Sequence, residues 1–277
     1  MPHSSPLMAH NSTLVVKIGG STLGAHDTSM ADLARLQHGG RRIVVVHGGG
    51  PAISDWLKRL KTPTRFVRGL RVTDAASLDV VVAVLAGIVN KQLVAGLNAL
   101  GARACGVSGA DAGIIQAVYE DEELGYVGRI AQVDVSPIDA LLEAGFLPVV
   151  APVAVLKGAD GRVSAQLLNV NADTVAGELA AALAAERLIF LTDVDGVHGA
   201  DGNLVRELTS LEAEALLGAG VIRGGMIPKV EAGLRSGASG TSCVILDGRE
   251  AGSLYKALEP HAPGTVIGAF ACAGGGA

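Results

Sequence analysis

Two short apolar segments, each followed directly by a cluster of glycines, constrain the fold of this chain most. LVVKI at 14–18 leads into Gly-Gly at 19–20, and RIVVVH at 42–47 leads into Gly-Gly-Gly at 48–50 and Pro51. Val- and Ile-rich runs of this length are typical of strands buried on both faces of a parallel sheet. Because proline suits the first turn of a helix, the second cluster is predicted to be a strand-to-helix turn.

The rest of the chain alternates in the same way, which predicts an α/β fold. Aromatic residues are only 3% of the chain while hydrophobic residues are 49%, so we expect a core of Val, Leu, Ile and Ala. The polar stretch 62–73 is predicted to be a loop or hairpin. The remaining strands are predicted at 102–109, 113–136 (antiparallel), 146–155, 187–193, 242–246 and 265–267, and the helices at 28–38, 51–60, 75–99, 137–144, 169–185, 210–217, 227–237 and 250–258.

Charge and composition exclude several classes of protein. The 22 basic and 27 acidic residues form no basic run, so no nucleic-acid partner is expected. The longest apolar run, at 80–89, is half of the roughly 20 residues that a membrane span needs. The N-terminus shows no signal-peptide pattern, and the three distant cysteines suggest neither a disulfide framework nor a zinc site. We expect a cytoplasmic protein that does not contact a membrane.

The chain lacks internal repeats and linkers, and its composition shifts slightly near 165–170. We expect a disordered tail at 1–12, an N-terminal lobe at 13–166 and a C-terminal lobe at 167–277.

The glycine clusters are predicted to bind phosphate. A strand that ends in glycine and turns into a helix presents free backbone N–H groups at the positive end of the helix dipole. One such pair alone is more often an ordinary tight turn, but two of them, one preceded by Lys17, favour an anion site. Neither G-x-x-x-x-G-K-[ST] nor G-x-G-x-x-G occurs in the chain, which argues against a P-loop or a dinucleotide fold.

Two cationic residues stand out by their positions. Lys17 lies inside an apolar strand, where an unpaired ammonium would be costly; the alternative is an alternating strand with Lys17 facing solvent. Arg71, in GLRVTD at 69–74, has a guanidinium group that suits a carboxylate, although a lone arginine is more often a surface residue.

Three further segments follow strands or open helices. NVNAD at 169–173 fits helix capping, but it has more polar residues than capping needs, so Asp173 could orient lysines. TDVDG at 192–196 could form a turn or contact a nucleotide. GGMIPK at 224–229 places a second lysine, Lys229, near a helix start.

Eight motifs, in this order along nearly the whole chain, resemble the amino acid kinase family. They are KIGGS at 17–21, VVHGGGP at 45–51, GLRVTD at 69–74, VNKQLV at 89–94, VSGADAG at 107–113, LNVNAD at 168–173, TDVDGV at 192–197 and GGMIPK at 224–229. The resemblance implies a three-layer αβα sandwich around a mainly parallel central sheet.

The closest resemblance within the family is to enzymes that phosphorylate the side-chain carboxylate of N-acetyl-L-glutamate with MgATP, in arginine biosynthesis. The runner-up is the relative that acts on carrier-protein-linked aminoadipate or glutamate. A catalytically silent amino-acid or nucleotide sensor on the same fold is a third reading, against which the intact lysines and Asp173 argue.

The resemblance also implies a role for individual residues. Lys17 and Lys229 would stabilise the transferring phosphoryl group, to which the N–H groups of Gly20 and Gly49 would donate, with Asp173 holding both lysines. The acyl amino acid would be bound by Gly48, Gly49, Arg71 and Asn169. The nucleotide would be bound by Lys17, Lys229, Asp193, Val194, Asp195, Gly196, Val197, His198, Val221, Ile222 and Arg223.

Mg²⁺ would be carried on the ATP phosphates rather than by a protein metal site. Members of the family that arginine inhibits carry a longer N-terminal helix, which joins dimers into hexamers. About a dozen polar residues precede the first strand here, so we expect a homodimer without arginine feedback.

Overall fold

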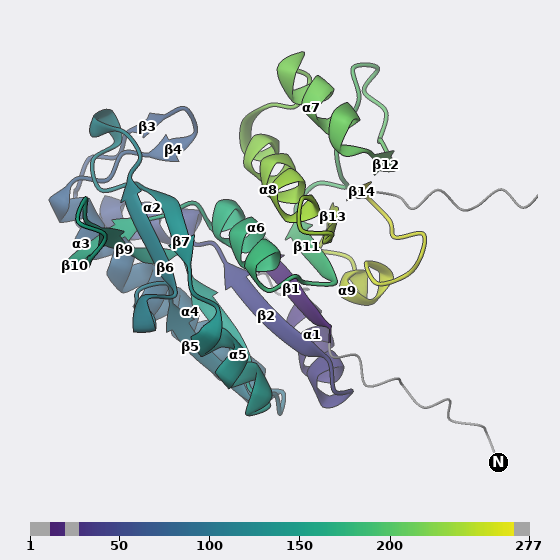
Figure 1. The fold of residues 1–277 in the computed structure, drawn as a ribbon, viewed down its shortest axis with the longest axis horizontal. Helices are drawn as coiled ribbons and strands as arrows, with labels where there is room; N and C mark the ends of the chain where they lie inside the picture. Colours follow the sequence, from purple (N-terminus) through teal and green to yellow (C-terminus); the bar gives the residue numbers. More distant parts are fainter. Residues whose placement is uncertain (1–11, 20–27, 269–277) are drawn as a thin grey trace, which may run out of the picture.

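A mostly parallel eight-stranded sheet forms the centre of the computed structural model, which describes residues 12–19 and 28–268 (Figure 1). All its neighbouring strands run parallel except β13 and β14. Its strands, in spatial order, are β12 (Glu207–Leu208), β14 (Thr265–Ile267), β13 (Ser242–Asp247), β11 (Arg187–Thr192), β1 (Thr13–Ile18), β2 (Arg42–His47), β8 (Leu147–Ala151) and β5 (Ala104–Ser108).

Helices cover both faces of this sheet, because its central strands are apolar on both sides. In β1, Leu14 and Val16 belong to one core cluster and Val15 to the other. The first face is covered by α1 (Ser29–His38), α2 (Gly50–Arg59), α9 (Ser253–Lys256) and a long helix over 75–99; the second by α5 (Ser136–Glu143), α6 (Ala172–Ala182), α7 (Ser210–Gly218) and α8 (Ile227–Gly237). The predicted three-layer αβα sandwich is therefore confirmed.

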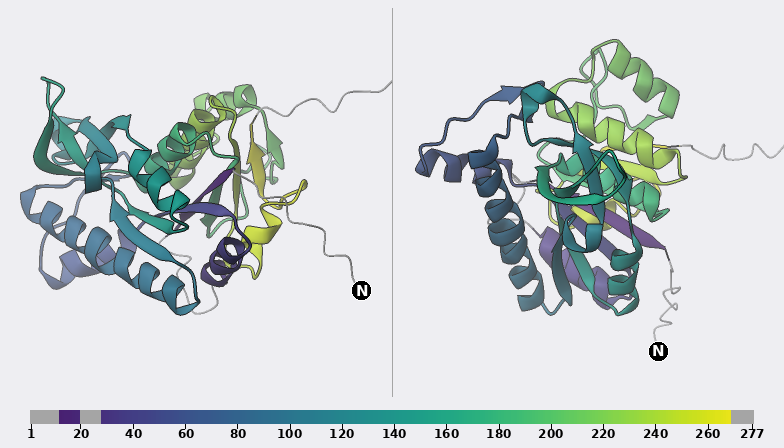
Figure 2. Two further views of the ribbon diagram at one scale, coloured as in Figure 1. Left: turned by 60° about the horizontal axis from the view of Figure 1, so that its bottom comes forward. Right: turned by 60° about the vertical axis from the view of Figure 1, so that its left-hand side comes forward.

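The long helix runs along one side of the sheet (Figure 2). It consists of α3 (Ala75–Val82), a π-helical segment (Ala83–Val89) and α4 (Asn90–Ala99). Its 25 residues are long and apolar enough to span a membrane by length and composition alone. Val81, Leu85, Leu93 and Leu97 are buried in the core under the sheet, which is the packing of a core helix.

The strand expected over 146–155 and a smaller second sheet depart from the prediction, whereas the expected hairpin is present. The strand predicted over 146–155 is two strands in two sheets, β8 and β9 (Val153–Lys157), because the chain turns at Pro152, which has no N–H to continue a ladder. β9 joins β6 (Ile115–Tyr119), β7 (Gly128–Val133) and β10 (Val163–Asn169) in the order β10-β9-β6-β7. The expected hairpin within 62–73 is present as β3 (Phe66–Val67) and β4 (Leu70–Arg71).

β10 and β12 were not predicted, and α9 is shorter than the helix expected at 250–258. The helix expected from 169 begins at Ala172 instead, after the cap Asn171. Most of β10 is exposed or half-buried, so it has no apolar run that could identify it as a strand.

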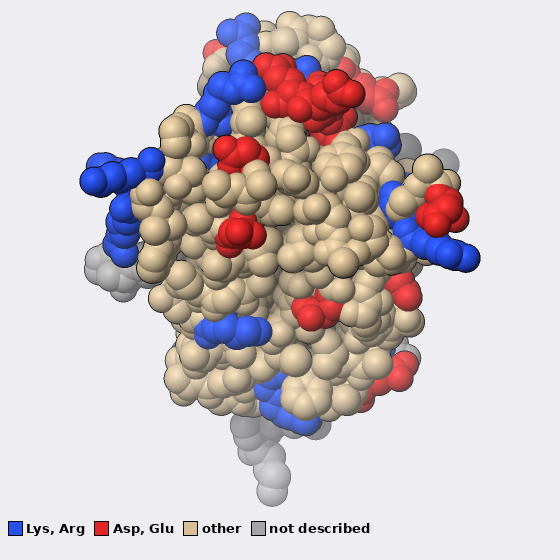
Figure 3. All heavy atoms as spheres, turned by 90° about the vertical axis from the view of Figure 1, so that its left-hand side faces the viewer, with Lys and Arg blue, Asp and Glu red and all other residues tan. Residues whose placement is uncertain are grey.

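Lysine and arginine side chains are dispersed among uncharged surface on the face shown in Figure 3. The site described next lies at the carboxyl ends of β1, β2 and β11. These three strands are adjacent and parallel, with Ile18 level with both His47 and Leu191. The residues that follow them, Gly19, Gly48 and Asp193, therefore lie at one edge of the sheet.

Candidate active site

A buried cluster of two lysines and one aspartate occupies this edge. Lys17 Nζ lies 2.7 Å from Asp173 Oδ1, and Lys229 Nζ donates to Asp173 Oδ2 at 2.9 Å. Lys229 also donates to the carbonyl of Gly225 at 3.1 Å. The side chains of Lys17 and Asp173 are only 9% and 8% exposed. The three residues come from β1, the first turn of α6 and the first turn of α8, so the fold brings together three predicted site residues.

The charged groups of the cluster shift one another's pKa values. Burial lowers the pKa of Lys17 below its usual range, although the carboxylate of Asp173 opposes that shift. Burial would raise the pKa of Asp173, but the two ammonium groups outweigh it and hold that pKa below its usual range. Asp173 is thus a carboxylate shared by two cations, and the cluster has a net positive charge that suits an anionic ligand.

Close packing of α6 against α8 holds the aspartate and the second lysine together. A Cβ on Gly177 of α6 would lie 2.7 Å from the Cβ of Ala232 in α8, so only glycine permits this approach. Asn171 caps α6 by accepting from the backbone N–H groups of Asp173 and Thr174 at 2.8 and 3.2 Å. The capping interpretation of this segment is confirmed for Asn171.

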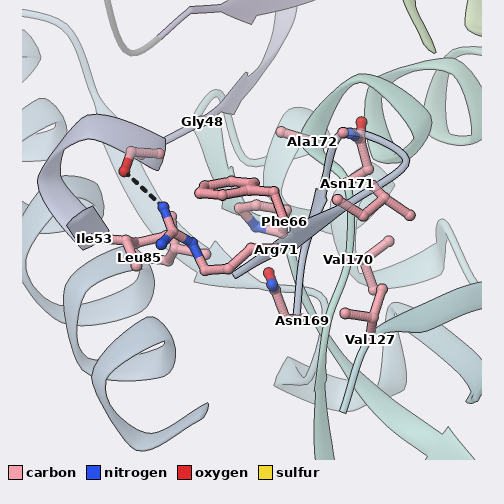
Figure 4. Close-up of a pocket in the computed structure, with 15 residues that line it drawn as sticks. Gly48, Ile53, Phe66, Arg71, Leu85, Val127, Asn169, Val170, Asn171 and Ala172 are labelled. Carbon is pink, nitrogen blue, oxygen red and sulfur yellow. Dashed lines mark hydrogen bonds between the residues drawn. The ribbon is translucent and has the colours of Figure 1, made fainter. Parts of the chain in front are cut away.

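Arg71 and Asn169 face a cavity of about 190 Å³ beside the second glycine cluster (Figure 4). Arg71, buried in β4, donates through Nη2 to Ser54 Oγ at 2.8 Å and to the carbonyl of Gly50 at 3.2 Å. Its Nη1 is buried without a hydrogen-bond partner. An orphaned guanidinium nitrogen is costly, so it is poised for an anionic group entering the cavity. The surface reading of Arg71 is therefore wrong.

Asn169 ends β10 and donates through Nδ2 to Thr73 Oγ1 at 3.1 Å. Its side chain lines the same cavity as Gly48 and Gly49. The rest of that wall is Gly50, Ile53, Phe66, Gly69, Leu70, Arg71, Leu85, Val127, Pro152, Val170, Asn171 and Ala172.

A larger cavity of about 600 Å³ connects this pocket to the charged cluster. It is lined on one side by Asp173 and Lys229, and it shares with the smaller pocket Gly69, Leu70, Val127, Val170 and Asn171. A ligand bound at Arg71 thus lies next to the cavity that Asp173 and Lys229 line.

The segment Asp193–His198 follows β11 at the same edge of the sheet. The charge of Asp193 is close enough to raise the pKa of Lys17, against the larger effect of burial. Asp195 accepts from His198 Nε2 at 2.8 Å, a bond that lowers the pKa of Asp195 and raises that of His198. Asp195 also lines a cavity of about 200 Å³ with Asp247 and Gly264.

The second segment predicted to bind the nucleotide, residues 221–223, does not line any of the cavities described above. Within it, Ile222 is buried and Arg223 Nε donates to the carbonyl of Gly220. The segment leads into Gly224 and Gly225, which do line the large cavity. Gly20 lies outside the described residues.

Sequence reasoning missed two residues beside Arg71. The Phe66 ring lies under its guanidinium carbon at 4.7 Å, and Ser54 is one of its acceptors. Ser54 lies four residues after Gly50, one turn into the helix that the glycine cluster opens, and this spacing was the available signal. Among residues 12–19 and 28–268, no group of three or more His, Cys, Asp or Glu side chains could hold a metal ion.

These features define a class of α/β protein that places paired lysines and a glycine turn at the carboxyl edge of a mostly parallel sheet. Comparison with known families matches residues 12–247 to the amino acid kinase family. The chain belongs to this family.

The names of individual relatives point to one activity within this family. The chain is 44% identical over 257 residues to the acetylglutamate kinase of Dehalococcoides mccartyi, covering 93% of this chain and 94% of that one. It is 48% identical over 244 residues to the acetylglutamate kinase of Parasynechococcus marenigrum, covering 85% and 82%. Among solved structures, smu.665 from Streptococcus mutans UA159 superposes with a TM-score of 0.78 at 30% identity, covering 93% of this chain and 99% of that one.

Proposed function

We propose that this protein transfers the γ-phosphoryl group of ATP to the side-chain carboxylate of N-acetyl-L-glutamate, forming N-acetyl-L-glutamyl 5-phosphate. The observation that carries the proposal is the Lys17–Asp173–Lys229 cluster, whose Asp173 and Lys229 line a cavity that adjoins the pocket containing the orphaned guanidinium nitrogen of Arg71. The names of the two curated relatives support the same substrate. They do not favour the carrier-protein-linked substrates or the silent sensor.

The reaction explains why the site has cations and N–H groups but needs no general base. A carboxylate is already a nucleophile, so catalysis consists of aligning two anions and neutralising the charge of the transferring group. Lys17 and Lys229 supply that charge, and the backbone N–H groups of Gly20 and Gly49 donate to the same oxygens. Asp173 positions both ammonium groups without touching the substrate.

The acyl amino acid binds in the smaller pocket. Arg71 Nη1 takes its α-carboxylate, and Asn169 together with Gly48 and Gly49 fixes its remaining α-substituents. The apolar side chains of Ile53 and Leu85 border this space and suit an acyl group better than a free ammonium.

ATP binds on the C-terminal side, along Asp193–His198 and Val221–Arg223. In this assignment residues 13–166 form the lobe that binds the acyl amino acid and mediates dimerisation, and residues 167–277 form the lobe that binds ATP. Mg²⁺, which prefers phosphate oxygens and water, travels with the nucleotide and neutralises part of its charge. The enzyme works in the cytoplasm, where ATP is abundant.

The protein functions as a homodimer. β5 is an edge strand of the central sheet, and such edges readily pair with another chain. In the most apolar window of helix 75–99 only 39% is buried, so apolar helix surface remains for a second copy.

An assay of ADP release tests the function directly. N-acetyl-L-glutamate, L-glutamate and L-aspartate are offered side by side to the enzyme with MgATP. Release that depends on N-acetyl-L-glutamate and exceeds that with the free amino acids supports the proposal. Equal release with all three, or none above the ATPase background, would overturn it.

A further inference from the structure

A buried histidine and asparagine behind the second glycine cluster have no part in the mechanism above. His47, the last residue of β2, is fully buried, and Asn90, the first residue of α4, is 1% exposed. Asn90 Nδ2 lies 3.2 Å from His47 Nε2, and His47 Nδ1 lies 2.8 Å from the carbonyl oxygen of Gly48.

The surroundings fix the orientation of Asn90. Its Nδ2 donates to the carbonyl of Val149 at 2.8 Å, and its Oδ1 accepts from Lys91 Nζ at 3.1 Å. Gly106 of β5 makes room for this amide, since a Cβ there would lie 2.0 Å from Asn90 Oδ1. Because Nδ2 can only donate, the atom it meets, His47 Nε2, must be an acceptor.

The histidine therefore has one defined tautomer. Nε2 accepts from Asn90, so the ring proton lies on Nδ1, which donates to the Gly48 carbonyl. Burial lowers the pKa of His47 to about 4, so the ring is neutral at neutral pH. Burial is the main cause of this low pKa; the hydrogen bond to the Gly48 carbonyl opposes it, and the nearby cations Lys17 and Lys91 add to it.

The Gly48 carbonyl and the Gly49 N–H belong to one peptide unit. This unit is planar and trans, so its C=O and N–H point in opposite directions. A carbonyl held against the buried His47 ring directs the Gly49 N–H away from the core, and Gly49 lines the pocket on that side. The same N–H is the one that the proposed function aims at the transferring phosphoryl group.

The long helix supports this arrangement through its π-helical turn. The Asn90 backbone N–H donates to the Leu85 carbonyl, five residues back, so the wider turn places Leu85, Val89 and Asn90 on one side. Leu85 and Val89 approach Gly49 closely: a Cβ on Gly49 would lie 2.6 Å from Leu85 Cδ2 and 3.6 Å from Val89 Cγ2. The side chain of Asn90 thus joins the helix to His47, while Leu85 and Val89 pack against the glycine turn.

We infer that His47 and Asn90 are positioning residues that orient the Gly48–Gly49 peptide, so that the Gly49 N–H stabilises the transferring phosphoryl group. The inference rests on the proposed function. It assigns the VNKQLV segment at 89–94 a task in catalysis that is distinct from substrate binding.

The first test is Asn90→Leu, which keeps the side-chain size and removes the donor. A misdirected N–H stabilises the transition state less, while binding of the substrates in the ground state changes little. The kcat is therefore expected to fall about 10- to 100-fold, with both KM values within about threefold of the wild type. Affinity for MgADP with aluminium fluoride, a mimic of the transferring group, should fall in parallel with kcat, while affinity for MgADP alone should not.

Two control variants separate positioning from lost stability. Thr241→Val removes a buried hydrogen bond to the Ala185 carbonyl, outside the site. Asn98→Leu removes two bonds between the same helix and Ala104 of β5. Both should leave kcat within about twofold of the wild type, even where the melting temperature falls as much as in Asn90→Leu.

The histidine is tested by two partial replacements. The amide of His47→Asn can reach the Gly48 carbonyl as Nδ1 does, whereas that of His47→Gln extends to the position of Nε2. We expect His47→Asn to retain the higher kcat, and we expect ¹⁵N NMR of the wild type to show His47 neutral and protonated on Nδ1.

The inference is overturned if Asn90→Leu retains kcat within about twofold, if the controls lose as much, or if His47→Gln equals or exceeds His47→Asn. Protonation on Nε2 would also overturn it. A wild type without activity on N-acetyl-L-glutamate would reject the proposed function instead, whereas an active wild type with an unaffected Asn90→Leu would reject this inference alone.

Discussion

Lys17 illustrates how much a single buried charge reveals about its surroundings. An ammonium within an apolar strand needs a carboxylate nearby, which the sequence alone predicts. Asp173, 156 positions away along the chain, meets that need at 2.7 Å. The identity of such a partner depends on which helix crosses the strand ends; the excess of polar residues at 169–173 suggested Asp173, and the resemblance to a family assigned it.

Arg71→Ala tests the substrate pocket. Losing the guanidinium removes a charge-assisted contact to a carboxylate, so the KM for N-acetyl-L-glutamate should rise about 10- to 100-fold, corresponding to roughly 1.5–3 kcal/mol. The kcat at saturation should change only a few-fold, because the contact exists in both ground and transition states. Steady-state kinetics with each substrate varied in turn measure both values.

Arg65→Ala is the matched control, since Arg65 precedes the same hairpin but is 60% exposed and pairs with Glu123. It should leave both constants near wild type. A loss of kcat at unchanged KM in Arg71→Ala would place this arginine at the reacting group rather than at the α-carboxylate.

The low pKa of His47 is expected to make the stability of the folded protein sensitive to acid. The unfolded chain binds a proton on this ring from about pH 6.5, whereas the folded protein resists until about pH 4. The free energy of unfolding should therefore fall as pH falls through this window, by about 3 kcal/mol in total, and the contribution should be constant below it. Urea unfolding at several pH values measures the slope.

His47→Asn removes the titrating group, so the difference in stability between wild type and variant should shrink as pH falls from 7 to 4. Other groups contribute equally to both proteins and cancel in that difference. A pH-independent difference would show that His47 titrates normally in the folded state.

At the scale of elements, the contact of α6 with α8 sets the distance between Asp173 and Lys229. In Gly177→Ala the new Cβ would lie 2.7 Å from Ala232 Cβ and 3.0 Å from its carbonyl oxygen, so the helices must separate. We expect a loss of about 1–3 kcal/mol in the free energy of unfolding, together with a lower kcat.

Gly237→Ala provides the control, because the same methyl group at the end of α8 meets nothing within 4 Å. It should change stability by less than about 1 kcal/mol in either direction and leave kcat unchanged. Denaturant unfolding measures the stability of both variants, and steady-state kinetics measures their kcat. Equal effects in the two variants would show that the close approach of α6 to α8 does not set stability or kcat.

Elements with strong apolar patterns were predictable and polar ones were not. β1, β2, β11 and β13 have continuous apolar runs, and the structure places each as expected. β10 is mostly exposed or half-buried, and β12, with two residues, is too short to show an alternation of apolar and polar side chains. The division of 146–155 into two strands depends on which sheet each half joins, which local sequence does not specify. The π-helical turn also lacks a local signature.

At the scale of the molecule, the α/β layering followed from strands apolar on both faces, since each face must be covered by helices, and the three-layer αβα sandwich was implied by the family resemblance. The second sheet did not, because it depends on the pairing of β6 with β9, and between these two strands the chain contributes β8 to the central sheet. Among candidate site residues, the sequence singled out Lys17, Asp173 and Lys229. It could not foresee the orphaned nitrogen of Arg71, which exists only after β4 has packed against α2.

The dimer proposal makes a prediction at this scale. Light scattering after size exclusion should give twice the chain mass at micromolar concentrations, because the open edge of β5 and the apolar surface of helix 75–99 need a partner. Adding L-arginine should change neither the mass nor the activity. A monomer that is fully active would contradict the assembly but not the chemistry.

Formation of the acyl phosphate is the most direct test of the central claim. Hydroxylamine converts N-acetyl-L-glutamyl 5-phosphate into a hydroxamate, and the coloured complex of that hydroxamate with ferric ion can be measured for wild type, Lys17→Ala and Lys229→Ala at matched circular dichroism. We expect hydroxamate to form only when both ATP and N-acetyl-L-glutamate are present. Each variant is expected to lose about 100-fold or more in turnover, with smaller changes in KM. Normal turnover in Lys17→Ala would contradict it.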